Sequence, residues 1–163
     1  MSYAIVQSST FISNYPPSLY IASHTIKISK SEFFATTENP ANHVTLFGFT
    51  LSLQSNTVSL LYPGTPQSNM KLGFMSATLH SGKINMTGLN MTCSRYFFIE
   101  TNKITQTNLK MEVNCATCSP DEFTLENSLQ VYHYNQKTLD RDMCKSCPAG
   151  AICNGYIRVL YCS

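Results

Sequence analysis

Apolar and polar residues alternate in short runs along the first 113 positions, which is the pattern of half-buried β-strands. Five runs align without gaps, each with two marked apolar positions followed by a third. They are Ala4-x-Val6-x4-Phe11, Ile26-x-Ile28-x4-Phe33, Leu51-x-Leu53-x4-Val58, Ile84-x-Met86-x4-Met91 and Ile104-x-Gln106-x4-Met111. Gln106 is the one polar residue at a marked position. Small or turn-forming residues precede each third position and predict a bend between two strands.

The runs recur at irregular intervals of about 20 to 33 residues, which is typical of a parallel β-helix with loops of unequal length. We therefore expect an all-β fold with about five coils. The marked side chains point inward in such a coil, and the residues between them point outward. These outward residues are Lys27, Ser52, Asn85 and Thr105. An antiparallel β-sandwich would give similar strands and is the alternative fold.

Hydrophobic repeats stop near residue 114, where cysteines begin to cluster. We therefore expect a repeat domain over residues 1–113 and a cysteine-rich module over residues 114–163. The module cysteines are Cys115, Cys118, Cys144, Cys147, Cys153 and Cys162. A segment this short, with little apolar content, needs disulfides or a metal to fold.

Six cysteines can close three disulfides within the module. The two Cys-x-x-Cys pairs could instead hold a tetrahedral Zn²⁺ through Cys115, Cys118, Cys144 and Cys147. That alternative leaves Cys153 and Cys162 unexplained, so disulfides are favoured and no metal is expected. The seventh cysteine, Cys93, shares the inward parity of Met91 and is expected to be a buried free thiol.

The module resembles ephrin-receptor-like and EGF-like cysteine-rich modules in the run Cys144-x-x-Cys147-Pro148-x-Gly150-Ala151-x-Cys153-x-Gly155, preceded by Cys115-x-x-Cys118-Ser-Pro. The repeats resemble the pectin-lyase-like right-handed parallel β-helix of polymorphic outer-membrane proteins and adhesins. Similar modules follow β-helix repeats in very large cell-surface proteins of protists and algae. The resemblance implies an extracellular, disulfide-stapled region. Ser-Pro-Asp-Glu after Cys118 departs from the Pro and Gly often found there.

Two sequons, Asn85-Met-Thr87 and Asn90-Met-Thr92, predict N-glycosylation and agree with secretion. No secretory signal peptide is visible after Met1. We therefore expect an N-terminally truncated fragment of an extracellular or cell-surface protein. The longest mostly apolar stretch, residues 44–53, is too short for a membrane helix, although the whole protein could be membrane-anchored.

Composition and charge argue against several classes of function. Charged residues make up 12% of the chain and the net charge is +2, without the basic stripe that binds nucleic acid. A hydrolase needs two or three convergent carboxylates, and a lyase needs clustered acids for Ca²⁺. The acids of the repeat region form no row along the aligned runs: Glu32, Glu38, Glu100 and Glu112. The histidines lack metal-ligand spacing: His24, His43, His80 and His133.

Tyrosines near the predicted loops could stack on sugar rings or contact other surface proteins. They are Tyr3, Tyr15, Tyr20, Tyr62 and Tyr96. We therefore expect a non-catalytic domain without a cofactor that serves adhesion, recognition or structural spacing. The alternatives are a polysaccharide-active enzyme related to pectin lyases and an intracellular zinc-binding module.

Overall fold

The computed structural model describes residues 1–13, 16, 18–37, 41–105, 107–124, 130–134 and 144–160. These residues form strands, turns and bends without a helix, which confirms the all-β prediction. No membrane-spanning helix is found in this part of the chain.

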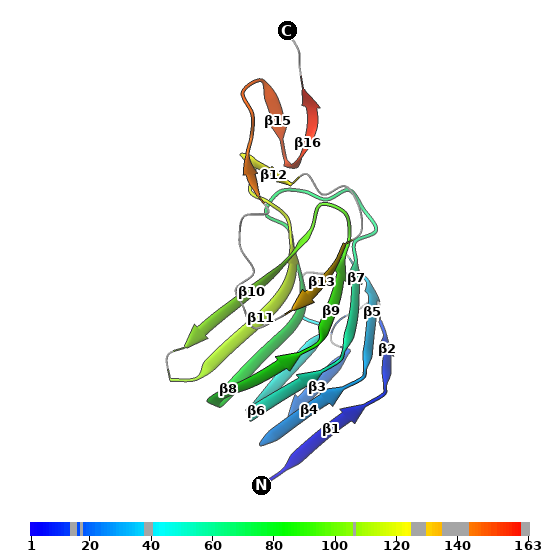
Figure 1. Ribbon diagram of the computed structural model, residues 1–163, viewed down its shortest axis with the longest axis vertical. Coiled ribbons are helices and arrows are strands. Elements are labelled where there is room, and N and C mark those ends of the chain that lie inside the picture. Colours follow the sequence, from blue (N-terminus) through cyan, green and yellow to red (C-terminus); the bar gives the residue numbers. More distant parts are fainter. Residues whose placement is uncertain are drawn as a thin grey trace.

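The described strands form three sheets (Figure 1). The largest sheet has the order β1 (Tyr3–Gln7), β4 (Thr25–Ser29), β6 (Val44–Gln54), β8 (Lys71–Thr87), β11 (Leu109–Ala116) and β10 (Phe98–Thr105), and β3 (Leu19–Ala22) also pairs with β6. The second sheet has the order β13 (Gln130–Tyr134), β9 (Leu89–Cys93), β7 (Thr57–Leu61), β5 (Glu32–Thr36) and β2 (Thr10–Ile12). The third has the order β14 (Lys145–Ser146), β12 (Glu122–Thr124), β16 (Gly155–Leu160) and β15 (Ala151–Cys153).

The first four sequence runs lie side by side in the register that their alignment predicts. In the largest sheet, parallel pairing makes successive partners of Ala4, Ile26, Leu51 and Ile84. In the second sheet, parallel pairing makes successive partners of Phe11, Phe33, Val58 and Met91. Strands β1 to β9 therefore pair in parallel, which excludes the antiparallel β-sandwich for this region.

The fifth run does not continue the stack, so the expectation of about five parallel coils is wrong. Its residues lie on β10 and β11, which form an antiparallel hairpin that pairs Ile104 with Lys110. Ile104 is 56% exposed instead of pointing inward. Thr107 and Asn108 lie in the bend of this hairpin, so the chain reverses within the fifth run. Because β11 and β13 also pair antiparallel with β8 and β9, both large sheets are mixed and do not form a uniform solenoid.

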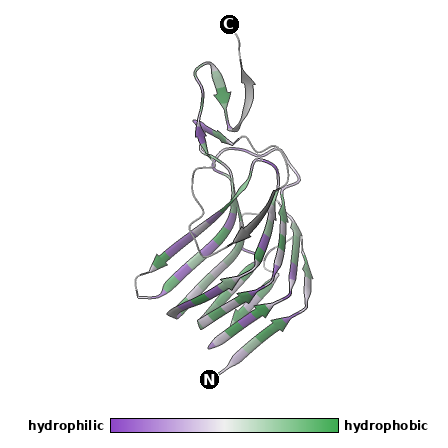
Figure 2. Cartoon of the chain, viewed as in Figure 1, coloured by the Kyte–Doolittle hydropathy of each residue, from purple (hydrophilic) through white to green (hydrophobic). Residues whose placement is uncertain are grey.

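Apolar side chains from both large sheets form one core, and hydrophobic and hydrophilic residues alternate along the strands (Figure 2). Ile26 and Ile28 are buried, whereas Lys27 between them is exposed. Met86 is likewise buried next to the exposed Asn85. In these two runs the alternation therefore predicts correctly which side chains face the core, unlike at Ile104 in the fifth run.

The bends between the two large sheets lie in register. The residue at each bend has a left-handed backbone: Ser8 (φ 49°), Lys30 (φ 50°), Ser55 (φ 52°) and Gly88 (φ 68°). The buried Asn56 joins two of these bends, since its Oδ1 accepts a hydrogen bond from the Ser31 N–H at 3.0 Å. Its Nδ2 donates to the Ile28 carbonyl, also at 3.0 Å. The side chain thus hydrogen-bonds backbone groups on both sides of the neighbouring bend.

Three disulfides hold the C-terminal third of the described chain. They are Cys93–Cys115, Cys118–Cys144 and Cys147–Cys153. The expectation that Cys93 is a free thiol is wrong, as is the expectation that Cys115 pairs within the module. Cys93 points inward from β9 as its parity predicts, but β11 places the equally buried Cys115 next to it across the core. Cys162 lies outside the described residues.

The zinc alternative requires four free thiolates. Its sulfurs are instead distributed over all three disulfides, because Cys115, Cys118 and Cys147 each have a different partner. No group of His, Cys, Asp and Glu side chains within the described ranges is arranged to hold a metal ion. The proposed Cys-x-x-Cys zinc site is therefore corrected to disulfide cysteines.

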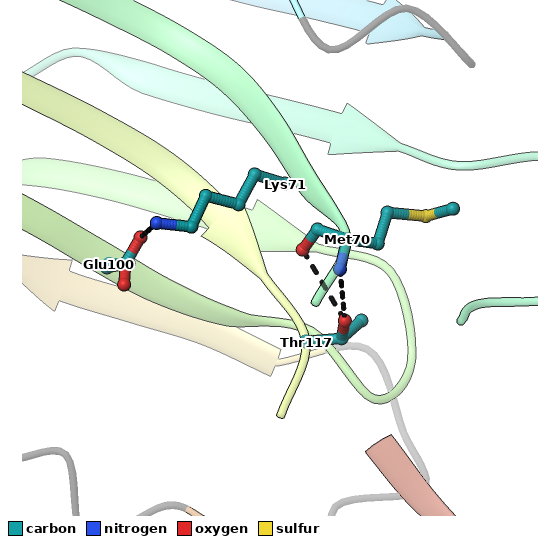
Figure 3. Close-up of polar contacts among 4 residues, drawn as sticks. All are labelled: Met70, Lys71, Glu100 and Thr117. Atoms are coloured by element: carbon teal, nitrogen blue, oxygen red, sulfur yellow. Dashed lines mark hydrogen bonds and ion pairs between the residues drawn. The ribbon is translucent and has the colours of Figure 1, made fainter. Parts of the chain in front are cut away.

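The cysteine-rich strands project from the end of the β-structure that lies opposite the N-terminus (Figure 1). The Thr117 hydroxyl oxygen accepts a hydrogen bond from the Met70 N–H at 2.9 Å (Figure 3). The Thr117 N–H donates to the Met70 carbonyl, also at 2.9 Å. Next to this contact, Lys71 on β8 forms an ion pair with Glu100 on β10 at 2.7 Å. These contacts fix the end of β11 where the chain enters the small sheet.

Gly155 of the Cys153-x-Gly155 motif lies at the start of β16 with φ +77°. A Cβ at this position would lie 3.3 Å from the Cys118 carbonyl oxygen, so glycine suits both the backbone and the space. The boundary predicted between residues 113 and 114 falls inside β11. The repeat region and the cysteine-rich segment are therefore connected through a continuous strand.

Candidate ligand-binding groove

Parallel pairing brings three loops together at one end of the second sheet. Strands β5, β7 and β9 are neighbours with the same direction, so the segments that follow their carboxyl ends lie side by side. The Thr37 N–H donates to the Leu61 carbonyl at 2.9 Å, and the Tyr62 N–H donates to the Ser94 hydroxyl oxygen at 2.7 Å. These bonds link the residues at the carboxyl ends of the three strands.

The loops enclose a groove of about 480 Å³. Its lining residues are Thr36, Leu61, Tyr62, Pro63, Gly64, Thr65, Pro66, Ser94, Arg95, Tyr96 and Phe97. The volume lies in the range of small-ligand sites, which bury apolar and aromatic surface and orient the ligand with a few polar groups. Arg95 is the one charged residue among these lining residues.

One wall of the groove is a tight turn over Ser94–Phe97. The Phe97 N–H donates to the Ser94 carbonyl at 3.1 Å, which closes the turn. Tyr96 has φ +68°, a left-handed conformation that a bulky residue adopts at a cost of about 1–3 kcal/mol. The turn directly follows the buried Cys93, which is bonded to Cys115 on β11. A turn anchored in this way holds the exposed Arg95 and the half-buried Tyr96 in one arrangement.

The opposite wall is the segment Tyr62–Pro66, with two prolines that limit its backbone freedom. The Tyr62 ring lies against Gly64, where an added Cβ would come within 3.1 Å of the Tyr62 hydroxyl oxygen. Tyr62 also packs on Phe97, with ring centroids 6.0 Å apart. The aromatic floor of the groove is therefore built from both walls.

The structure separates the tyrosines that the sequence grouped as ligand contacts. Tyr62 and Tyr96 line the groove, whereas Tyr20 packs on Phe47 on another part of the surface, with ring centroids 5.7 Å apart. Tyr3 is exposed on the edge strand β1, and Tyr15 lies outside the described residues. Arg95 was not predicted as a ligand contact, although it lies between the Met91 run and an aromatic segment.

The acidic residues are spread over different elements. Glu32 is exposed on β5, and Glu112 is exposed on β11. Glu100 is engaged by Lys71 in the ion pair near the small sheet. Glu38 lies outside the described residues.

The described histidine side chains lie outside the groove. His24 and His80 flank Phe49 on the surface, with ring centroids 4.4 Å and 5.2 Å from it. His43 is 2% exposed, and its Nδ1 lies 3.2 Å from the Ser18 hydroxyl oxygen. Burial lowers the pKa of His43, because a charged imidazole would lose its hydration. The side chain of His133 is not described.

The two predicted glycosylation sites differ in their surroundings. Asn85 is exposed on a part of β8 that pairs with β6 on one side, as the strand alternation predicts. Asn90 is half-buried on β9, between partner residues on β7 and β13. Glycosylation of either residue stays a prediction.

No protein-family model, curated protein or solved structure matches this chain. The geometry of the groove and the disulfides are therefore the basis for a functional proposal.

Proposed function

We propose that this chain is a non-catalytic, extracellular recognition domain that binds carbohydrate in the groove formed by Tyr62–Pro66 and Ser94–Phe97. The observation behind the proposal is that two tyrosines and one arginine line one groove with a volume of about 480 Å³. Such a domain would serve adhesion at a cell surface or attachment to a glycan-rich matrix.

The groove offers the contacts that sugars require. Sugar rings have apolar C–H faces that pack on aromatic rings, and Tyr62 and Tyr96 supply these rings together with hydroxyl groups for hydrogen bonds. The hydroxyls of Thr36 and Thr65 line the same surface. Walls that are already ordered reduce the entropy lost on binding. This saving matters for sugars, because desolvation of their many hydroxyl groups also opposes binding.

The three disulfides support an extracellular location, because such bonds form and persist mainly in oxidising compartments. The spread of the acidic residues supports a role without catalysis, since glycoside hydrolysis uses two carboxylates that flank one bond. For strands β1 to β9 alone, we keep a right-handed parallel β-helix as a proposal, supported by the register of their pairing. In this proposal the stacked strands are the scaffold that presents the groove.

Binding to an array of neutral, carboxylated and sulfated glycans tests the proposed function. The test variant is Tyr96→Gly, which removes the ring and suits the left-handed backbone at this position. We expect it to fold at least as stably as the parent chain and to lose glycan binding. Tyr20→Ala is the matched control, because it removes an exposed tyrosine away from the groove. Absence of glycan binding by the parent chain, or full binding by Tyr96→Gly, would contradict the proposal.

A further inference from the structure

We infer that the groove is selective for anionic carbohydrate, and that Arg95 is the residue that determines this selectivity by binding a carboxylate or sulfate on the sugar. The inference rests on the proposed function and names the class of ligand for the same site.

The charge of the groove is complementary to an anion. Arg95 brings a positive charge to the rim of the groove, and none of the described residues that line the groove is acidic. Within the described ranges no carboxylate pairs with Arg95, whereas Lys71 near the small sheet is paired with Glu100. An anionic group on the ligand would therefore form an ion pair with the Arg95 guanidinium. A neutral ligand would leave the guanidinium without a counter-charge.

The turn over Ser94–Phe97, which carries Arg95, has a fixed position. Arg95 occupies the second position of the turn closed by Ser94 and Phe97, two residues after the disulfide-bonded Cys93. The backbone of this turn is held in place even though Tyr96 adopts a costly conformation. Arginine binds carboxylate and sulfate oxygens through two parallel hydrogen bonds, so a fixed backbone favours one orientation of the anion.

Aromatic residues line the groove together with Arg95. Tyr96 follows Arg95 directly, and Tyr62 reaches the groove from the other wall. An acidic sugar presents an apolar ring face and an anionic substituent on the same small unit. The groove offers an aromatic surface and a cation within one small-ligand volume.

The experiment compares glycans that differ in charge with proteins that differ at Arg95. The full chain is applied to an array of neutral, carboxylated and sulfated glycans, and the tightest ligand is titrated by calorimetry. Arg95→Gln removes the cation, and Arg95→Lys keeps the charge without the two-pronged geometry. Lys110→Gln is the control, because it removes the same charge from an exposed position on β11 outside the groove.

We expect the bound glycans to carry a carboxylate or a sulfate, and the two arms of the array show which anion is preferred. Arg95→Gln should weaken binding at least about tenfold, and Arg95→Lys should weaken it less. Lys110→Gln should stay within about twofold of the parent chain, since screening limits the effect of a distant charge. Equal binding of neutral glycans, with no loss in Arg95→Gln, would overturn this inference and leave the proposed function standing. Failure of the parent chain to bind any glycan would overturn the proposed function itself.

Discussion

Removal of the Cys93–Cys115 disulfide should destabilise the protein more than removal of a disulfide inside the cysteine-rich segment. The Cys93–Cys115 bond closes a loop with a sequence separation of 22 residues, and Cys147–Cys153 closes one of 6 residues. Loop-closure entropy then gives about 3 kcal/mol for the first bond and about 2 kcal/mol for the second. The first bond also joins β9 and β11 inside the core, where Cys93 and Cys115 are 1% and 0% exposed.

The assay is urea unfolding of protein secreted under oxidising conditions, followed by tyrosine fluorescence because the chain has 9 tyrosines and no tryptophan. The test protein carries Cys93→Ala and Cys115→Ala, and the matched control carries Cys147→Ala and Cys153→Ala. We expect the test protein to lose about 3 kcal/mol of unfolding free energy. For a chain of this size the loss corresponds to a fall in Tm of about 6–12 °C.

Two results would refute this reasoning. One is a loss below about 1 kcal/mol in the test protein, which would mean that the bond does not restrict the unfolded chain as loop closure requires. The other is alkylation of Cys93 in the unreduced, denatured parent chain. That result would restore the free thiol expected from the sequence and remove the covalent link between the sheets.

Three further predictions concern stability and modification. Burial lowers the pKa of His43 below the 6.5 of the unfolded chain, so unfolding takes up a proton at mildly acidic pH. The unfolding free energy present above pH 6.5 should therefore fall as the pH drops below that value. His43→Gln should flatten this part of a denaturation series across pH, and an unchanged slope would contradict the assignment. Asn56→Ala should lower the unfolding free energy by about 1–3 kcal/mol, because it removes the side-chain hydrogen bonds to the Ser31 N–H and the Ile28 carbonyl; equal stability in urea would show that these groups are satisfied otherwise. In a glycosylating host, Asn85→Gln should remove one glycan from the intact mass, and an unchanged mass would show that this exposed sequon is not used.

The aligned repeats explain the position of the groove better than its chemistry, although no groove was predicted from the sequence. Thr36, Leu61 and Ser94 each lie three residues after a marked apolar position of their run, and the structure places these residues together along one edge of the groove. Parallel stacking in register makes this outcome predictable, because equal offsets from aligned positions reach the same place in neighbouring strands. The sequence also pointed to Tyr62 and Tyr96, but only the structure shows that these two tyrosines converge.

The features that the sequence did not reveal depend on contacts between distant segments. The spacing of apolar residues in the fifth run does not reveal that β10 and β11 form an antiparallel hairpin. Ile104 and Met111 keep the same spacing as the corresponding residues of the parallel coils. The Cys93–Cys115 disulfide depends on that hairpin, because its strand β11 carries Cys115 and pairs alongside β8. The strained backbone of Tyr96 is a further consequence of packing, since local preference would place glycine or asparagine there.

The central claim is that carbohydrate binds between the two walls of the groove. The most direct test is to map backbone amide chemical shifts of the isotope-labelled full chain as the tightest array ligand is added. The account predicts that the shifts concentrate at Thr65, Arg95 and Tyr96, with little change around Tyr20 and Phe49 on the outer surface. Shifts centred on Tyr20 and Phe49, with the groove unchanged, would place the binding site elsewhere and contradict the account.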